Sequence, residues 1–541
     1  MGAVMKKRYV WLVLGLCWFC VSTSVHAAKQ TLTSMVNTPL TTLDSTKYAV
    51  ASDSEAITAY AEGLYTYDAQ QHIVLGVAAK APTVNRAKTQ YTFTLKHTRW
   101  SNGQPVTADD FVYAWQRLAN PKRKSRNASK VAFLQNGAAV VSGKRPYTAL
   151  GVKALGKYRL QITLAQPTPY LSRTLVGAAL VPINRHFAHQ MGAKYGTAAR
   201  YVLANGPFQI QNWNGTQDKQ WRYVKNPDYW DAAQVTLQRV KLRVVRTSKQ
   251  AARLFDRGQL DYAQLTDQTV QRYTGYKVLH QRQTITAAYL FFNTQAVDLK
   301  NLALRQALAQ SFDKRLLVDG VLRNGSEPLN GLIPEQLIKT PTHQRDYRTA
   351  VGKLTNTSYN VRRATKAWHK AQAQLGRRRL TVTLLLSNTP QNLQIGRFLQ
   401  AQMQHTLPGL TVKLKTVSLE KRIQLEGKGH FQIVLGMWTP TDTDPANYVG
   451  FFKSTSLMNV SHYQNAAYDR GLAELSGRLA TQPSPRMHKI KSLEQQAVSK
   501  ATVVAPVYQS SQTYLQAQRV KGLQVSKLGS MVNYKFTHIQ S

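Results

Sequence analysis

The stretch that most constrains the fold of this chain is WSNGQPVTADDFVYAWQRLANP, residues Trp100–Pro121. Residues 91–95, just before it, alternate between apolar and polar side chains, which is the period of a half-buried strand. Asn102-Gly103 predicts a tight turn, because both residues tolerate positive φ. Thr107 is a good N-cap, aspartates follow in the first helical turn, and apolar residues recur at helical spacing until Asn120-Pro121. The stretch therefore predicts a strand, a tight turn and a buried amphipathic helix.

Hydrophobic periodicity predicts further elements on both sides of this stretch. Strands are predicted over Thr31–Val36, Leu380–Leu386 and Phe431–Leu435, and helices over Ser54–Leu64 and Ala364–Leu375. Helical and strand patterns are mixed along the chain, which favours an α/β class. At 541 residues the chain exceeds the size that one hydrophobic core usually fills, so at least two lobes are expected.

The stretch over residues 100–121 also resembles a signature of the extracytoplasmic oligopeptide-binding proteins of peptide ABC importers, solute-binding protein family 5. Further segments resemble the same family in the same order, from about Thr42 to about Gly522. They include Thr42-Leu43-Asp44, Glu62–Tyr65, Asn205–Phe208, Asn226–Trp230, Tyr289–Asn293 and Arg305–Leu308. The resemblance implies a two-lobed periplasmic-binding-protein-like α/β fold of the large class, with an extra inserted subdomain and a ligand cleft between the lobes.

The resemblance also implies where the lobes begin and end. Residues 28–75, 204–293 and 506–541 would form lobe I, residues 76–203 a subdomain inserted into it, and residues 294–505 lobe II. Two chain crossings, near Tyr289–Asn293 and near Ala505–Tyr508, would then form the hinge between the lobes.

The N-terminus predicts a secretory signal over residues 1–27. Lys6-Lys7-Arg8 is a basic start, an apolar run from Val10 to Val21 follows, and Val25-His26-Ala27 is a small-residue cleavage site. The run is shorter than the ~20 apolar residues of a membrane span. Both cysteines, Cys17 and Cys20, lie in this segment, so the mature chain has no disulfide, thiol nucleophile or cysteine-ligated metal.

An export signal of this kind indicates an extracytoplasmic protein of the cell surface, the cell wall or the periplasmic space. A lipid anchor on either cysteine is not favoured, because Leu16 and Phe19 stand where a lipoprotein signal has a small residue. We therefore expect simple cleavage near Ala27.

The net charge of the chain is unusually positive. Lys and Arg total 71 against 26 Asp and Glu, a formal charge of +45, and loss of Lys6, Lys7 and Arg8 with the signal leaves +42. The cations are spread along the chain rather than gathered on one helix or arm, which argues against nucleic acid as the partner. We expect electrostatic association with an anionic cell wall or membrane surface. A cationic adhesin remains an alternative.

The sequence contains no convincing catalytic or metal-binding constellation. There is no His-Glu-x-x-His, no Gly-x-Ser-x-Gly and no glycine-rich dinucleotide loop. Gly151-x4-Gly156-Lys157 mimics a phosphate loop, but Tyr158 replaces the Ser or Thr that holds magnesium, so a hairpin is expected there. Asp442 and Asp444 are a close carboxylate pair, yet their spacing in a turn is typical of local backbone hydrogen bonding. We expect no enzyme activity, cofactor or metal.

The best candidate site is the predicted loop Gly436–Tyr448, because it follows an apolar strand and strand ends are common places for ligand contacts. In the family that the chain resembles, a Trp of this loop packs on the ligand and an aspartate three residues later pairs with the α-ammonium of a peptide. Trp438 matches the Trp, but the aspartate position falls on Thr441. Either Asp442 takes over the ammonium, or the protein does not anchor a free amine there. The candidate ligand-binding residues of this loop are Gly436, Met437, Trp438, Thr439, Thr441 and Asp442.

Four more candidates come from the same resemblance. Ala49, Val50 and Ala51 lie where an extended segment pairs with the ligand backbone, and Tyr508 lies at the hinge, facing the cleft. The implied mechanism is strand addition, in which the peptide main chain supplies the hydrogen bonds. The implied function is capture of oligopeptides by a monomer and their delivery to a membrane-embedded ABC permease with cytoplasmic ATPases. Alternatives on the same fold are a dipeptide, a signalling peptide, haem, nickel or a sugar as the ligand.

Overall fold

The computed structural model describes residues 30–540, apart from 353, 441–443, 457 and 528–530. The predicted signal over residues 1–27 lies outside the described residues. Within the described ranges, no helix combines the length and the apolar composition needed to cross a bilayer.

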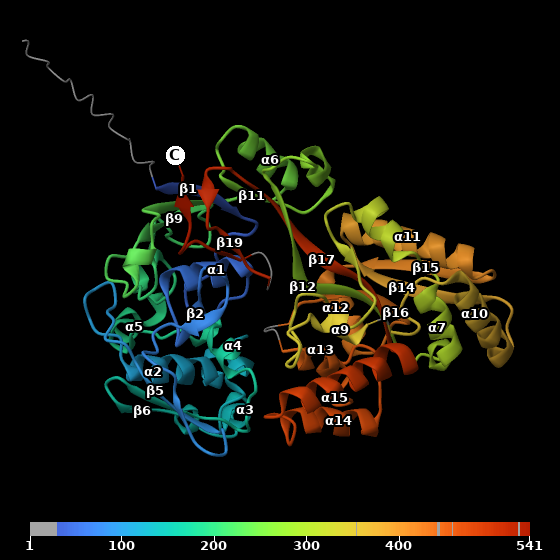
Figure 1. Ribbon diagram of the computed structural model, residues 1–541, viewed down its shortest axis with the longest axis horizontal. Coiled ribbons are helices and arrows are strands. Elements are labelled where there is room, and N and C mark those ends of the chain that lie inside the picture. Colours follow the sequence, from blue (N-terminus) through green and yellow to red (C-terminus); the bar gives the residue numbers. More distant parts are fainter. Residues whose placement is uncertain (1–29, 353, 441–443, 457, 528–530, 541) are drawn as a thin grey trace, which may run out of the picture.

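A seven-stranded mixed sheet connects the two halves of the molecule (Figure 1). Its main path runs β11-β17-β12-β16-β14-β15, and the short β13 pairs with β17. The strands are β11 (Tyr262–Leu265), β17 (Val504–Gln516), β12 (Leu279–Phe292), β16 (Ile433–Trp438), β14 (Leu380–Ser387), β15 (Leu410–Val417) and β13 (Glu327–Pro328). β12 and β17 are long antiparallel neighbours that pass from one half to the other.

The buried side chains show that these halves have separate cores. One large cluster draws on residues between 32 and 273 and again between 514 and 539. Two other clusters, on opposite faces of the sheet, draw on residues between 285 and 508. We call the first half lobe I and the second lobe II. β12 and β17 contribute side chains to both, so the lobe boundaries expected at residues 293 and 506 stay predictions.

Lobe I is built on a four-stranded sheet with the order β1-β10-β9-β8. Its strands are β1 (Thr31–Val36), β10 (Arg239–Val244), β9 (Gln220–Lys225) and β8 (Phe208–Gln211). Around it lie α1 (Ala51–Tyr60), α6 (Ser248–Asp256) and the hairpin β2 (Tyr65–Tyr67) and β3 (Ile73–Leu75). The C-terminal tail adds two short pairs, β18 (Val520–Lys521) with β21 (His538–Ile539) and β19 (Gln524–Val525) with β20 (Val532–Asn533).

A second four-stranded sheet, β4-β5-β7-β6, carries the segment that the sequence predicts to be an inserted subdomain. The strands are β4 (Thr83–Val84), β5 (Gln90–Thr94), β7 (Arg159–Thr163) and β6 (Val152–Gly156), and the helices are α2 (Ala108–Ala119), α3 (Gly137–Val141), α4 (Leu171–Leu175) and α5 (Arg185–Met191). β6 and β7 are antiparallel, which confirms the expected hairpin in place of a phosphate loop.

The stretch over residues 100–121 folds as the sequence predicts. Asp110 accepts hydrogen bonds from the Thr107 N–H (2.9 Å) and the Trp100 indole N–H (3.2 Å), so it closes a capping box and also fixes the preceding turn. Burial raises the pKa of Asp110. The Trp115 indole donates to the carbonyl of Leu180 at 3.0 Å, which anchors α2 in the lobe I core.

Helices cover both faces of the sheet in lobe II. They are α7 (Leu302–Gln310), α8 (Lys314–Leu316), α9 (Tyr347–Val351), α10 (Val361–Leu375), α11 (Pro390–Thr406), α12 (Leu419–Gly427), α13 (Ala446–Val449), α14 (Ala466–Ser476) and α15 (Pro483–Gln495). Buried residues of α7, α10 and α11 pack on one face, and buried residues of α13, α14 and α15 on the other. The predicted strand over Leu380–Leu386 and the predicted helix over Ala364–Leu375 are therefore confirmed as β14 and α10.

Candidate functional site

A cavity of about 200 Å³ lies where β12 and β17 pass between the lobes. Lobe I contributes the end of β11, lobe II contributes Gln391 of α11 and Met437 of β16, and the crossing strands supply most of the rest. The complete lining is Gln264, Leu265, Thr266, Thr284, Thr286, Asn324, Gln391, Met437, Tyr508, Ser510, Ser511 and Gln512. All of these residues are uncharged, so the cavity offers neutral hydrogen-bond donors and acceptors beside a few apolar groups.

Two of the predicted ligand-binding residues, Met437 and Tyr508, meet in this cavity. The Tyr508 hydroxyl lies 3.8 Å from the sulfur of Met437. Ala288 of β12 pairs with Met437 on one side and with Tyr508 on the other, and its small side chain lets the two larger ones approach above it. Burial raises the pKa of Tyr508, so the phenol is neutral near pH 7.

The prediction of a loop over Gly436–Tyr448 is wrong at both ends of this range. Residues 436–438 continue strand β16, because β12 extends alongside and pairs with all three of them. Residues 446–449 form α13. Gly436 is buried in the sheet, where a Cβ would lie 2.9 Å from the Phe291 ring, so its role there is close packing. The strand therefore places Met437 in the lining of the cavity.

Trp438 is half-buried at the end of β16. Its ring lies edge-on to Phe451, with 5.0 Å between ring centres, so one side of the indole packs on the lobe II core. The indole N–H is buried and has no hydrogen-bond partner among the described residues. Thr439, the next residue, shares a hydroxyl–hydroxyl hydrogen bond of 2.7 Å with Thr286 of β12. That bond fixes the point where the chain leaves the sheet.

Thr441 and Asp442 lie outside the described residues, so which of them contacts a ligand stays a prediction. Asp444, the next described residue, is firmly held. Asp444 accepts two hydrogen bonds from the Arg486 guanidinium, at 3.0 and 2.8 Å, and one from the N–H of Ala446 at 2.9 Å. Arg486 is itself buried. Asp444 is thus a structural anchor for this loop, in line with the local backbone bonding that its spacing indicates.

Arg486 also connects lobe II with the predicted inserted subdomain. Its guanidinium carbon lies 5.4 Å from the ring centre of Tyr170, which precedes α4. Burial raises the pKa of Tyr170, and the nearby Asp444 carboxylate raises it further. Tyr170 packs against the lobe II core cluster as a partly buried residue. This contact closes the space between the lobes on the side of α4 and α15.

Ala49, Val50 and Ala51 lie in lobe I, just before and at the start of α1, and do not line the cavity. Val50 has the extended backbone conformation that the sequence predicts for this segment (φ −122°, ψ 161°). The N–H groups of Ala49 and Val50 point toward the Asp53 carboxylate, at 3.1 and 3.4 Å. Ala49 and Ala51 are exposed. Their contact with a ligand stays a prediction.

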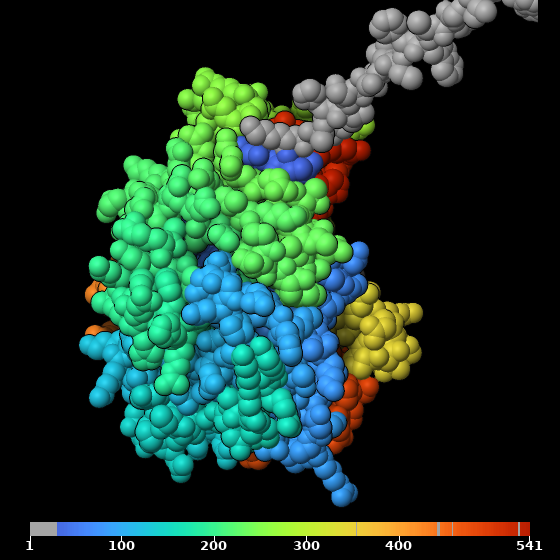
Figure 2. All heavy atoms as spheres, turned by 90° about the vertical axis from the view of Figure 1, so that its left-hand side faces the viewer, coloured from blue at the N-terminus to red at the C-terminus, as the bar shows by residue number. Residues whose placement is uncertain are grey.

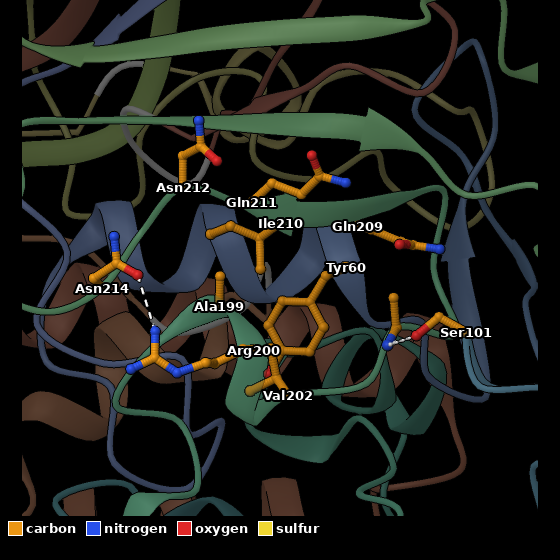
Figure 3. Close-up of a pocket in the computed structure, with 11 residues that line it drawn as sticks. Tyr60, Ser101, Ala199, Arg200, Val202, Gln209, Ile210, Gln211, Asn212 and Asn214 are labelled. Atoms are coloured by element: carbon orange, nitrogen blue, oxygen red, sulfur yellow. Dashed lines mark hydrogen bonds between the residues drawn. The ribbon is translucent and has the colours of Figure 1, made fainter.

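A second, larger hollow of about 620 Å³ lies within lobe I and contains none of the predicted residues (Figure 3). Four consecutive residues, 209–212, form one wall along β8, and residues 199–204 form the other. Tyr60 of α1 lies between them, and Arg200 donates to Asn214 across the opening at 3.1 Å. No residue of β12, β16 or β17 lines this hollow, and it shares no lining residue with the candidate site.

No group of three or more His, Cys, Asp or Glu side chains in the described ranges is arranged to hold a metal ion. Two acids of lobe II, the half-buried Asp444 and the buried Glu494, are each paired with an arginine.

A family model described as bacterial extracellular solute-binding proteins, family 5 middle, matches residues 72–459. The chain belongs to this family. The match covers much of both lobes, including β16, and it confirms the membership that residues 100–121 indicate.

Relatives and solved structures agree with the assignment to family 5. The "Dipeptide-binding protein" of Lactococcus lactis subsp. cremoris is 27% identical over 515 residues, which cover 92% of this chain and 91% of that one. The structure "Listeria monocytogenes OppA bound to peptide" is 30% identical, covers 95% of this chain and 100% of that chain, and superposes with a TM-score of 0.77. An oligopeptide ABC transporter substrate-binding domain of Bacillus anthracis is 29% identical, with a TM-score of 0.78 and coverage of 95% and 99%. The predicted two-lobed α/β fold is confirmed.

The family 5 resemblance did not point to most of the cavity lining. Ser510, Ser511 and Gln512 belong to a polar run, residues 509–513, between the apolar parts of β17, and that interruption of the strand pattern was a usable signal. On β12, Thr284 and Thr286 are polar residues on either side of the apolar Ile285, which was a similar signal. Asn324 and Gln391 carry no such signal, because only the tertiary fold brings them to the cavity.

Proposed function

We propose that this protein captures oligopeptides between its lobes and delivers them, unaltered, to the membrane permease of an ABC importer. The observation that carries the proposal is the neutral, hydrogen-bonding cavity at the crossing of β12 and β17, in a chain of a family whose relatives are named for binding peptides. Cytoplasmic ATPases would drive the permease. The protein itself would act as a monomer and would need no cofactor, metal or catalytic residue.

Recognition would rest on the peptide main chain. Val50 and its neighbours would offer an extended edge from lobe I, and Met437, Trp438 and Thr439 would close on the ligand from lobe II. Main-chain hydrogen bonds do not depend on the peptide sequence, which suits a carrier of mixed peptides. Water molecules would fill the space around ligand side chains and replace specific contacts.

Closure of the lobes would bury the ligand and form the surface that the permease recognises. Among the described strands, the long β12 and β17 have side chains that pack in both lobes, which supports a hinge along them. Their pairing is irregular between Gln283 and Ala287, and this break in the ladder gives the hinge a place to bend.

We also propose that the mature protein begins after Ala27 and works outside the cytoplasm, where several of its relatives are described as periplasmic. Its charge of +42 would hold it by electrostatic attraction to an anionic cell wall or membrane surface rather than to nucleic acid. For the α-ammonium of the peptide, two alternatives remain. Either Asp442 pairs with it, or the protein does not anchor a free amine there.

The test is mass spectrometry of ligands that co-purify with the mature protein, followed by calorimetry with the peptides found. Peptides of mixed sequence, bound with measurable heat and recovered uncleaved after incubation, are the expected result. Haem, nickel or a sugar as the co-purified ligand, or no heat with any peptide mixture, would overturn the proposal.

A second candidate is a preference for dipeptides. A cavity of about 200 Å³ is smaller than the ~300 Å³ lower end of common ligand pockets, and one relative is named a dipeptide-binding protein. The lengths of the co-purified peptides decide between the two, because a dipeptide carrier would retain no peptide of four residues or more.

A further inference from the structure

The predicted inserted subdomain, residues 76–203, differs sharply in charge from the rest of the protein. It contains twenty Lys and Arg residues but only two acids, Asp109 and Asp110, a net charge of +18. The rest of the mature chain carries about two cations for each acid, whereas the subdomain carries ten. Asp110 is buried in the capping box of α2. The surface of the subdomain is therefore almost purely cationic.

Most of these cations are free to meet a partner. Sixteen of the twenty are exposed, and none of the sixteen forms a salt bridge within the described part of the chain. They are Lys80, Arg86, Lys88, Arg99, Lys122, Arg123, Lys124, Arg126, Lys144, Arg145, Lys153, Lys157, Arg159, Arg185, Lys194 and Arg200. The single buried one, Arg117, pairs with Asp44 at 2.6 Å. The subdomain makes up most of the lower half of the face that lobe I turns away from lobe II (Figure 2).

Five of the exposed cations gather on two turns that touch. Lys122, Arg123 and Lys124 follow the end of α2, and Lys144 and Arg145 follow α3. A Cβ on Gly143 would lie 3.9 Å from Cγ of Pro121, so the two turns are in contact. We call these five residues the basic turn pair. No acid precedes or follows them closely in the sequence, because residues 111–217 contain none.

The cations also lie on both sides of the subdomain. Lys153 and Arg159 belong to β6 and β7, whose buried residues face α2, so these two side chains stand on the outer face of the sheet. The basic turn pair and Arg185 belong to the layer of helices on the inner side. A flat bilayer could touch only one side of the subdomain. The cations on the other side would then contribute little, because salt screens charges beyond about 8 Å. A flexible polymer could contact both sides.

We infer that the inserted subdomain is a binding module for a flexible polyanion, a phosphate-bearing polymer of the cell envelope, with the basic turn pair as its main contact. The inference rests on the proposed extracytoplasmic location. It adds a second binding activity that is separate from peptide capture, since none of the five residues lines the cavity between the lobes. Binding of this kind releases counterions and falls steeply as salt is raised.

The test uses the full mature protein and immobilised linear polyphosphate as the probe. One variant reverses the basic turn pair (K122E, R123E, K124E, K144E and R145E). A matched variant reverses five exposed cations of lobe II (R362E, R363E, K366E, K370E and R397E), so the net charge falls equally in both. We expect at least a tenfold loss of polyphosphate affinity in the first variant, less than a threefold loss in the second, and a shallower salt dependence in the first alone. Circular dichroism checks that both variants are folded.

Equal losses in the two variants would overturn the inference, because net charge alone would then account for binding. Tighter binding of the parent to phosphatidylglycerol vesicles or to duplex DNA than to polyphosphate, at equal phosphate concentration, would also overturn it. Peptide affinity, measured by calorimetry on the same samples, should be unchanged in both variants. A parent that binds polyphosphate but no peptide would refute the proposed transport function and leave this inference standing.

Discussion

The Glu55 carboxyl group, in α1, receives a hydrogen bond of 3.1 Å from the hydroxyl of Tyr534, which lies 479 residues further along the chain. The N–H of Val532 donates to the other carboxyl oxygen at 3.0 Å. The group is buried in the lobe I core, and this burial raises the pKa of Glu55 to about 8. The first helix and the C-terminal tail of the protein therefore meet at a carboxyl group that holds its proton at neutral pH.

This carboxyl group should make stability depend on pH. Between about pH 4.5 and 8 the folded state keeps the Glu55 proton that the unfolded chain has released, so the contribution of Glu55 to stability falls as pH rises through this window. E55Q, which is neutral at every pH, should match the parent near pH 4 and exceed its free energy of unfolding by on the order of 3 kcal/mol at pH 9. Urea unfolding at both pH values measures this. E420Q, at an exposed glutamate, is the control, and a difference between E55Q and parent that is the same at pH 4 and pH 9 would refute the prediction.

Replacement of Gly436 by any larger residue should destabilise the protein, because a Cβ there would lie 2.9 Å from the Phe291 ring. G436A should lower the free energy of unfolding by about 1–3 kcal/mol, since the strand or the ring must shift. It should also weaken peptide binding, because Met437 follows on the same strand. G450A is the matched control, with no heavy atom within 4 Å of the added Cβ. Chemical denaturation and calorimetry on both variants check this, and equal stability of the two would contradict it.

Asp442 should matter only to peptides with a free amino terminus. Loss of one partner from a buried charge pair costs ~2–5 kcal/mol, so D442A should reduce the affinity for a free-amine peptide by about 30-fold or more. The affinity for the N-acetylated form of the same peptide should change little. Calorimetry with the two forms against parent, D442A and T441A separates the alternatives. If D442A loses no affinity for the free-amine form, the protein does not anchor the amine at this residue.

Tyr170 should help to hold the lobes together, because its ring packs on Arg486 of the opposite lobe. A cation–π contact of this kind contributes ~0.5–2 kcal/mol, so Y170A should weaken peptide binding by roughly 3- to 30-fold. The change should appear as faster dissociation, since the contact needs the lobes to be close. Y147A, at an exposed tyrosine of the same subdomain, is the control. Stopped-flow dissociation rates measure the effect, and identical rates for Y170A and Y147A would rule out this role.

Local patterns account for the parts of the fold that the sequence predicted well. Thr107 and Asp110 are three residues apart, and a capping box needs no other part of the chain. The strand Thr31–Val36 was predicted with its observed bounds. The helix predicted over Ser54–Leu64 instead spans Ala51–Tyr60, because its final carbonyl accepts the N–H groups of Asn205 and Gly206, a contact that no local pattern reveals.

The candidate site was predicted only in part for the same reason. Met437 and Tyr508 were identified through the family resemblance, and the fold brings them together over Ala288. The loop after Leu435 was placed too early, since the length of β16 is set by its neighbour β12 rather than by its own residues. Gln264, Asn324 and Gln391 reach the cavity from three separate segments, so only the folded chain could show them.

The core of lobe I needs side chains from both ends of the protein, between residues 32 and 273 and between 514 and 539, whereas the cores of lobe II come from one continuous middle stretch. During synthesis the ribosome releases the amino end first, yet that end cannot complete its half of the molecule until the last residues emerge. Lobe II can assemble earlier, from residues already made. Truncation just after residue 508 would consequently remove part of the core of the half that was translated first and spare the cores of the half translated later.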